Sequence, residues 1–163
     1  MKQLLPAFLA GILTTLAFDP AGLWWLAPFT LALVFYLLLD TTPGRAFLTG
    51  WLFGAGLLCT GLVWIENSMS VYAGMPRALA ITLAMLLALG LALYYGLAAW
   101  LAVKLTSPKR KSARLIALAV LMVVMEWVRG WFLTGFPWLT IGYTQIDSWL
   151  AGYAPIGGVL LLS

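Results

Sequence analysis

The sequence predicts an all-α fold, a polytopic bundle of transmembrane helices with about five complete spans, the start of a sixth and a cytoplasmic N-terminus. Of the 163 residues, 64% are hydrophobic and 9% are charged, and the mean hydropathy is +1.03. A water-soluble domain carries about 25% charged residues. Nine basic and five acidic side chains are too few to cover a globule of this size, so most of the exterior must face lipid.

The spans are read from apolar runs. A hydrocarbon core about 30 Å thick needs roughly 17–25 helical residues at about 1.5 Å each. The first run starts near Pro6 and stops at Asp19-Pro20, because a residue before proline disfavours helix. The later runs are bounded by polar residues, glycine or proline. The six predicted spans cover residues 3–18, 24–39, 46–65, 76–103, 115–133 and 149–163, the last stopping mid-run at Ser163.

The first run has an alternative interpretation as a cleaved signal peptide, since Lys2 precedes it and residues 15–17 loosely resemble a cleavage site. The next apolar run begins about six residues after Phe18, which suits a tight helical hairpin better. We therefore expect the first run to be kept as a span.

The basic residues set the predicted orientation, because short loops rich in Lys and Arg stay in the cytoplasm. Alternating spans leave only Arg77 and Arg129 on or near the outer side. The same alternation puts four of the five acids in the outer half, at positions 19, 66, 126 and 147. The cytoplasmic set is Lys2, Arg45, Lys104, Lys109, Arg110, Lys111 and Arg114.

The third span carries a stripe of small residues that includes a GxxxG pair, Gly50 and Gly54. Small residues let helix backbones approach closely. We expect this face to pack within the chain, and dimerisation is the alternative. Cys59 on the same span is in an apolar setting and receives no role.

Glu126 and Arg129 are the main candidates for a buried ion pair. Their i,i+3 spacing puts them on one helix face, deep in the predicted fifth span. Ionisable groups at that depth cost about 2.5–3.5 kcal/mol each on insertion scales, so they normally face the protein interior or a wet cavity. A functional site and a structural pin between helices are equally good interpretations at this stage.

Residues 130–143 read GWFLTGFPWLTIGY, with helix breakers at Gly135 and Pro137 among several aromatic rings. We expect this segment to re-enter or skim the outer leaflet, although an ordinary aromatic belt has the same composition. Glu66 and Asn67 end the third span at a similar level. Several outer loops should therefore meet at one lipid-facing edge of the protein, called the rim below.

Some chemistry is excluded outright. The chain has no histidine and a single cysteine, so it encodes no internal disulfide, no zinc site and no histidine-based triad. We predict no metal and no cofactor. Five of the nine basic residues fall between Lys104 and Arg114, which indicates a loop and not a nucleic-acid interface.

The order of motifs resembles the apolipoprotein N-acyltransferase family across essentially all 163 residues. The most specific strings are 126–131 (EWVRGW), 133–138 (LTGFPW) and 142–145 (GYTQ), supported by 16–20 (LAFDP), 74–76 (GMP) and 154–159 (APIGGV). One departure is Glu66, where the family usually carries an aromatic residue; it puts that contact of the rim in doubt.

The resemblance implies a bacterial inner-membrane enzyme with eight transmembrane helices and a periplasmic nitrilase-like domain before the last one. A Glu-Lys-Cys triad in that domain takes an acyl chain from a phospholipid as a thioester and passes it to the diacylglyceryl cysteine of a lipoprotein. Residues 1–163 would be the transmembrane platform only. They hold no catalytic residue, Cys59 does not match the nucleophile, and the chain alone is predicted to be inactive.

The platform interpretation assigns roles to six residues. The substrate-binding rim would consist of Phe136, Trp138, Tyr143 and Gln145. Phe136 and Trp138 would contact acyl chains or headgroups, and Gln145 would also support the rim by hydrogen bonding. Glu126 and Arg129 would hold the loop. The expected partners are the phospholipid donor, the lipoprotein acceptor, membrane lipid and the nitrilase-like domain of the same full-length protein.

Two other functions remain open. A small transporter or channel subunit would use Glu126 and Arg129 to line a pathway and the broken segment near Pro137 as a binding site. Internal inverted repeats would favour that function, and none is visible. A stand-alone binding or assembly protein that keeps only the platform is the third possibility.

Overall fold

The computed structural model describes residues 3–163, and every regular element in that range is helical. Lys2, used above to orient the chain, lies outside the described residues. The all-α prediction is therefore confirmed for the described part of the chain. The longer helices are α1 (Leu4–Thr15), α2 (Leu26–Leu38), α3 (Pro43–Gly61), α5 (Arg77–Leu91), α6 (Leu93–Leu105), α7 (Lys111–Arg129) and α8 (Ala154–Leu162).

Short elements complete the chain. They are α4 (Val63–Asn67), the π-helical turn η1 (Ser68–Tyr72), and three 3-10 turns, η2 (Phe132–Thr134), η3 (Ile141–Gln145) and η4 (Trp149–Tyr153). The predicted sixth span begins at η4 and continues into α8, but Gly157 and Gly158 interrupt its helical geometry.

Within the part of the chain that the structure describes, one apolar helix is long enough to cross a membrane by itself. It comprises α5 and α6, joined at Ala92, and runs over 29 residues, within which a stretch of 18 residues has a mean hydropathy of 2.1. A second candidate is α3 followed by α4 and η1, two segments bent by 46° at their junction. The helices Leu4–Thr15, Leu26–Leu38 and Trp149–Leu162 are apolar but shorter. Length and composition thus support one or two spans, and the count of five stays a prediction.

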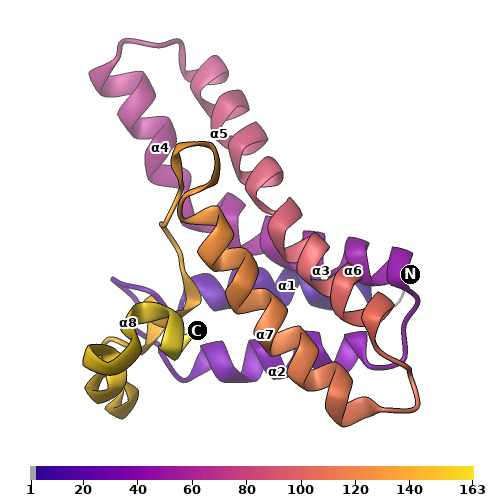
Figure 1. Cartoon of the computed structure of the whole chain (residues 1–163). Coiled ribbons are helices and arrows are strands. Elements are labelled where there is room, and N and C mark those ends of the chain that lie inside the picture. The colour runs from indigo at the N-terminus through magenta and orange to yellow at the C-terminus, as the bar shows by residue number, and fades with distance from the viewer. Residues whose placement is uncertain (1–2) are drawn as a thin grey trace.

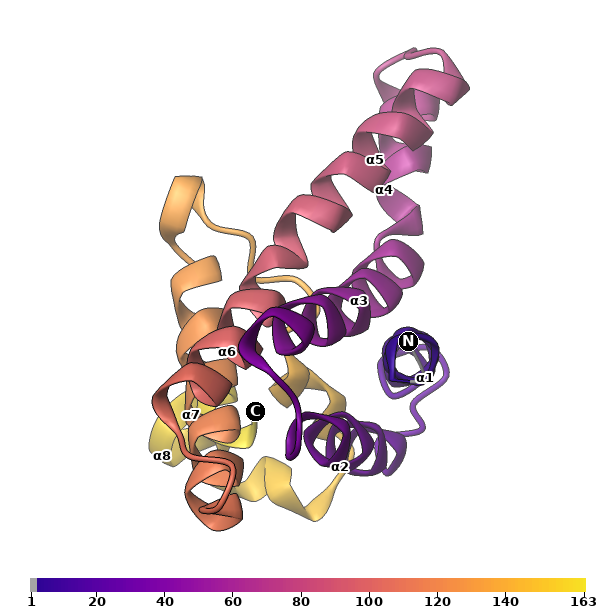
Figure 2. The ribbon, with the colours of Figure 1, turned by 90° about the vertical axis from the view of Figure 1, so that its right-hand side faces the viewer.

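Two of the helices continue into an arm. Figures 1 and 2 show α4, η1 and the first half of α5 extending side by side away from the other helices. The helical structure continues beyond residue 65, where the third span is predicted to end, because α4 includes Glu66 and η1 continues to Tyr72. Where the span itself ends stays a prediction. Glu66 can stay within the arm because Ser70 Oγ and Arg77 Nε donate to its Oε1 at 3.2 and 3.0 Å.

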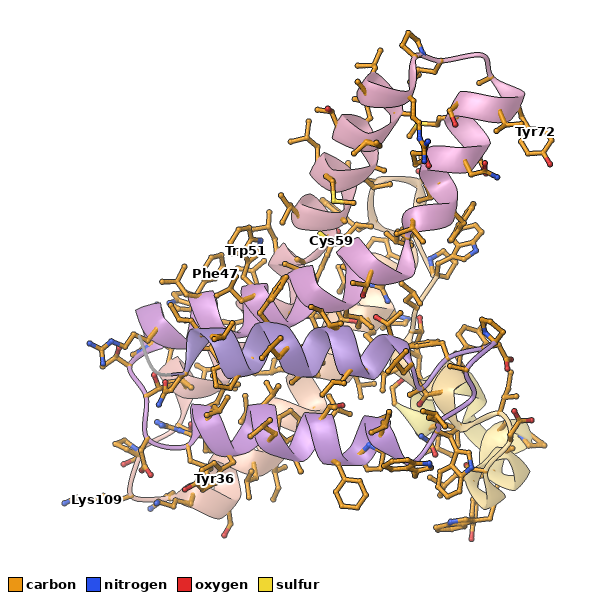
Figure 3. All side chains as sticks on the ribbon, turned by 180° about the vertical axis from the view of Figure 1, so that it is seen from behind. Tyr36, Phe47, Trp51, Cys59, Tyr72 and Lys109 are labelled. Carbon is orange, nitrogen blue, oxygen red and sulfur yellow. The ribbon has the colours of Figure 1, made fainter. Side chains whose placement is uncertain are left out.

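The arm makes these helices longer than a bilayer requires. A helix of 29 residues is about 43 Å long, against about 30 Å of hydrocarbon. Tyr72, 85% exposed, lies at the tip, far from Lys109 at the other end of the molecule (Figure 3).

Glycines on α3 allow close packing on two sides. Against α1, a Cβ at Gly56 would come within 2.2 Å of the Phe8 carbonyl oxygen, and one at Gly11 within 2.1 Å of that of Phe53. Against α6, a Cβ at Gly50 would come within 2.5 Å of the Tyr95 carbonyl oxygen, and one at Gly54 would also meet Tyr95. The GxxxG pair therefore packs within the chain, as expected.

Arg114 closes the end of the bundle opposite the arm. The sequence suggested only a basic loop residue, but the side chain is 1% exposed. Its guanidinium donates to the carbonyl oxygens of Leu39 at 2.6 Å, Thr106 at 2.8 Å and Val103 at 3.4 Å, and to Thr106 Oγ1 at 3.1 Å. These carbonyls lie at the C-terminal ends of α2 and α6, where a cation is favourable because the helix dipoles are negative there.

Candidate functional site

The segment that follows α7, residues 130–141, has an unusual backbone and is called the strained segment below. Leu133, Thr134 and Leu139 have φ values of 52°, 76° and 56°, a left-handed region that non-glycine residues rarely occupy. Gly135 has φ 80°, and a Cβ there would come within 2.2 Å of the Gly130 carbonyl oxygen. Such strain is held only where the surroundings fix the conformation, and it concentrates at functional sites.

The surroundings that fix it are the last turns of α7. Glu126 and Arg129 are buried, with side chains 3% and 1% exposed, and their Oε1 and Nη2 atoms lie 3.9 Å apart. This distance permits ionic attraction but no direct hydrogen bond. Oε2 of the glutamate and Nε of the arginine have no partner among the described residues.

Both side chains instead bond to the strained segment. Arg129 Nη1 donates to the Trp138 carbonyl oxygen at 2.7 Å, and its Nη2 lies 3.5 Å from Thr140 Oγ1. Glu126 Oε1 accepts from the Ile141 amide at 2.9 Å. The Phe136 amide also donates to the Arg129 carbonyl oxygen at 2.8 Å. Residues 136–141 are thus fastened to α7 at four points.

Two of the predicted rim residues are brought together with a third ring. The ring centroids of Phe136 and Trp138 are 5.1 Å apart, and Trp138 lies 6.0 Å from Trp64 of α4. Trp138 is half exposed at 52%. The pinned segment therefore presents an aromatic cluster, Phe136, Trp138 and Trp64, at the base of the arm.

The other two predicted rim residues lie elsewhere. Tyr143 is exposed and borders a separate hollow of about 270 Å³, beside Trp127 and Trp131. Gln145 is buried, and its Nε2 donates to the Trp24 carbonyl oxygen at 3.3 Å and to Thr144 Oγ1 at 2.9 Å. Gln145 therefore ties η3 to the loop before α2 and does not reach the rim surface.

A larger cavity of about 600 Å³ lies next to the aromatic cluster. Phe136 belongs to both features. One wall comes from the junction of α5 and α6, and the other from the start of the strained segment. The lining residues are Leu86, Leu87, Gly90, Leu91, Leu93, Tyr94, Leu97, Arg129, Phe132, Leu133, Thr134, Gly135 and Phe136.

Sequence reasoning missed several participants. Tyr95 of α6 donates its hydroxyl to Glu126 Oε1 at 3.2 Å. Thr140 Oγ1 lies 3.5 Å from Arg129 Nη2, and Trp64 adds a third ring to the aromatic cluster. Nothing in periodicity pairs positions so far apart along the chain. The available signal was the pair Tyr94 and Tyr95 in an otherwise apolar stretch, because a buried hydroxyl needs a partner.

No group of three or more Cys, Asp and Glu side chains within residues 3–163 is placed to hold a metal ion. The polar atoms of the site are a carboxylate, a guanidinium, hydroxyls and backbone groups. This set can position a backbone segment and attract a polar ligand.

Comparison with known proteins places this chain in a family. Residues 10–163 match the family model described as "Apolipoprotein N-acyltransferase N-terminal domain". The chain is 44% identical over 163 residues to the apolipoprotein N-acyltransferase of Vibrio parahaemolyticus, covering all of this chain and 32% of that protein. It is 45% identical over 161 residues to the protein of the same name from Chromobacterium violaceum, covering 98% of this chain and 31% of the relative.

The relative from Methylococcus capsulatus is 42% identical over 159 residues, with 98% of this chain and 32% of that protein covered. The chain thus spans about a third of the length of the curated relatives it matches. The match extends through the aromatic strings of residues 126–145 on which the resemblance was based. The chain belongs to the apolipoprotein N-acyltransferase N-terminal domain family.

Proposed function

We propose that this chain is the membrane platform of an apolipoprotein N-acyltransferase, an enzyme that transfers an acyl chain from a phospholipid to the N-terminal diacylglyceryl cysteine of bacterial lipoproteins. The platform anchors the enzyme and forms the rim through which lipids reach it. A nitrilase-like domain of the same full-length protein supplies the Glu-Lys-Cys chemistry, and residues 1–163 alone are inactive.

The proposed setting is the bacterial inner membrane, with several spans and the catalytic side in the periplasm. Lys104 lies in the last turn of α6, Lys109 and Arg110 lie in the loop that follows, and Lys111 begins α7. This loop is at the end of the molecule opposite the arm, where Figure 3 labels Lys109. With this basic end in the cytoplasm, the arm and the strained segment belong to the periplasmic side. Both helices of the arm exceed the bilayer thickness, which suits a structure that stands above the lipid surface.

The observation that carries the platform role is the way α7 holds residues 136–141. A pair of buried ionisable groups is costly in a membrane, and here both groups are directed at the backbone of one aromatic segment. A fixed backbone places Phe136 and Trp138 in one orientation beside Trp64. Rings held in this way can receive an acyl chain or headgroup without first being ordered, which lowers the entropic cost of binding.

The test is Trp138→Ala in the complete enzyme that carries this sequence, with acyl transfer measured from a phosphatidylethanolamine donor. Losing the contact area of a large aromatic ring is expected to cost about 1.5–3 kcal/mol. That corresponds to a fall in kcat/KM of about tenfold or more. Trp138→Phe keeps a ring and should retain most of the activity.

Trp149→Ala is the matched control, because Trp149 is exposed on η4 and its described ring contact is with Tyr153. The control should transfer acyl chains at the unaltered rate. Equal activity of Trp138→Ala and the unaltered enzyme would contradict the contact role.

A further inference from the structure

The end of the molecule opposite the arm carries a concentration of positive charge. Residues 39–45 and 104–114 contain six basic side chains and one acidic side chain, Asp40. Lys111 Nζ lies 2.9 Å from Asp40 Oδ2, which brings the two segments together. The basic side chains, called the basic patch below, are Arg45, Lys104, Lys109, Arg110, Lys111 and Arg114.

The protein neutralises little of this charge. The Lys111–Asp40 pair is open to water, with side chains 57% and 67% exposed, so the attraction between its members is weak. Among the described residues, no other side chain of the basic patch forms an ion pair with a carboxylate. All of the patch except Arg114 is exposed. The basic patch can therefore attract an anion from outside the chain.

The loop between α6 and α7 presents its basic side chains on a fixed backbone. The Arg110 amide donates to the Ser107 carbonyl oxygen at 3.0 Å, which closes a turn with Pro108 at its second position. Arg114 ties the base of this turn to α7, because its guanidinium donates to the Thr106 carbonyl oxygen at 2.8 Å. A backbone that is ordered in advance lowers the entropic cost of binding.

Apolar and aromatic side chains adjoin the basic patch, and they favour a lipid over a soluble anion. Leu105, next to Lys104, and Tyr36 of α2 are each 71% exposed. Figure 3 shows Tyr36 and Lys109 at the same end of the molecule. Lys104 Nζ lies 4.4 Å from the centre of the Trp100 ring, which holds the ammonium group against an apolar surface. Exposed aromatic rings beside Lys and Arg are typical of the interface between membrane and water.

We propose that the basic patch binds the headgroup of an anionic phospholipid in the cytoplasmic leaflet. The headgroup phosphate would lie against Lys109, Arg110 and Lys111, with an acyl chain beside Leu105. Clusters of about four to eight Lys and Arg at the cytoplasmic end of a membrane helix favour such lipids. The inference goes beyond the proposed function, because this lipid is not consumed and lies at the opposite end of the molecule from the rim. Only the proposed orientation is shared by the two.

The experiment uses the complete enzyme that carries this sequence, in vesicles of phosphatidylethanolamine and phosphatidylglycerol. Two probes with a photoreactive diazirine on the headgroup are compared, an anionic phosphatidylglycerol and a zwitterionic phosphatidylcholine. Labelled peptides are mapped by mass spectrometry. The readout is the ratio of anionic to zwitterionic labelling in residues 104–114, because this ratio cancels differences in the reactivity of the side chains.

The unaltered enzyme should prefer the anionic probe by about tenfold or more, since each basic group near an anionic surface contributes about fivefold. The triple variant Lys109→Gln, Arg110→Gln, Lys111→Gln should lose the preference. Lys109→Gln alone should lower it by about fivefold. The described hydrogen bond of Lys109, to Ser107 Oγ at 3.4 Å, is made by its backbone amide, so the single variant keeps the fold.

Two variants serve as controls. The double variant Lys109→Arg, Lys111→Arg keeps both charges and should keep the preference. Arg77→Gln removes an exposed charge in the arm, where Arg77 pairs with Glu66, and should leave the labelling of residues 104–114 unchanged. In about 1 M salt, where charges are screened beyond about 3 Å, the preference of the unaltered enzyme should fall.

Equal labelling by the two probes in the unaltered enzyme, or a preference that survives the triple variant, would overturn the proposal. So would RNA or an acidic protein that occupies the basic patch in place of lipid. Acyl transfer measured on the same variants keeps this proposal apart from the platform role. Loss of the preference with full acyl transfer supports a lipid site separate from the rim. If Trp138→Ala keeps full activity while residues 104–114 still prefer the anionic probe, the contact role of the rim fails and the basic patch stands.

Discussion

Glu126 is the residue whose replacement tests the pinned segment most directly. In Glu126→Leu, the Ile141 amide, the Tyr95 hydroxyl and the Arg129 guanidinium all lose the same buried oxygen. Removing one partner of a buried charged network costs about 3–5 kcal/mol, because the other groups stay buried and unsatisfied. We expect a loss of that size in the free energy of unfolding.

Glu126→Gln separates charge from hydrogen bonding. The amide oxygen can still accept from Ile141 and Tyr95, and only the attraction to Arg129 and the strength of charge-assisted bonds are lost. A cost of about 1–2 kcal/mol follows. The double variant Glu126→Leu with Arg129→Met removes the isolated charge, so it should be less damaging than the sum of the two single variants by about 1–3 kcal/mol.

The measurement is unfolding of the purified protein by sodium dodecyl sulfate in mixed phospholipid micelles, followed by tryptophan fluorescence. Midpoints and slopes give the differences in free energy between variants. The reasoning is refuted if the glutamine and leucine variants are equally unstable. It is also refuted if the double variant is additive within about 0.5 kcal/mol.

Three further predictions address packing and orientation. Gly11→Ala should lower the free energy of unfolding by more than the usual overpacking cost of about 1–3 kcal/mol, since its Cβ would meet the Phe53 carbonyl oxygen at 2.1 Å. Gly90→Ala, with open space around its Cβ, should be neutral or stabilising. Thermal unfolding of the two variants makes the comparison. Arg114→Met should lower the midpoint of thermal unfolding, because the part-buried carbonyls of Leu39 and Thr106 lose their donor, at a cost of about 2 kcal/mol. A wild-type midpoint would show that these bonds contribute nothing to stability. Cysteine introduced at Tyr72 should react with an impermeant thiol reagent from the periplasm and at Ser112 only after the inner membrane is opened, and the opposite pattern would reverse the proposed orientation.

The sequence was sufficient for the helical class of the fold and for the buried pair Glu126 and Arg129. Sixty-four per cent hydrophobic residues and few charges predict a lipid-embedded helical protein, and the helices of the described residues fall close to the apolar runs. Boundaries moved where polar side chains found partners. Glu66, near the end of α4, bonds to Ser70 and Arg77, and the helical turn η1 continues the chain beyond α4. The i,i+3 spacing of Glu126 and Arg129 identified the buried pair, because helical geometry alone puts these positions on one face.

Only the tertiary structure decided what those residues contact. Glu126 and Arg129 bond mainly to the backbone of residues 138–141 and to Tyr95, and Gln145 turns inward to Trp24 instead of outward to lipid. Arg114 is buried against helix ends that the sequence places far apart, and the cavity exists only where α5 and α6 meet the strained segment. Hydropathy and periodicity describe which face of a helix is buried. They carry no record of which backbone carbonyl or distant ring comes to face it, because that depends on how the helices cross.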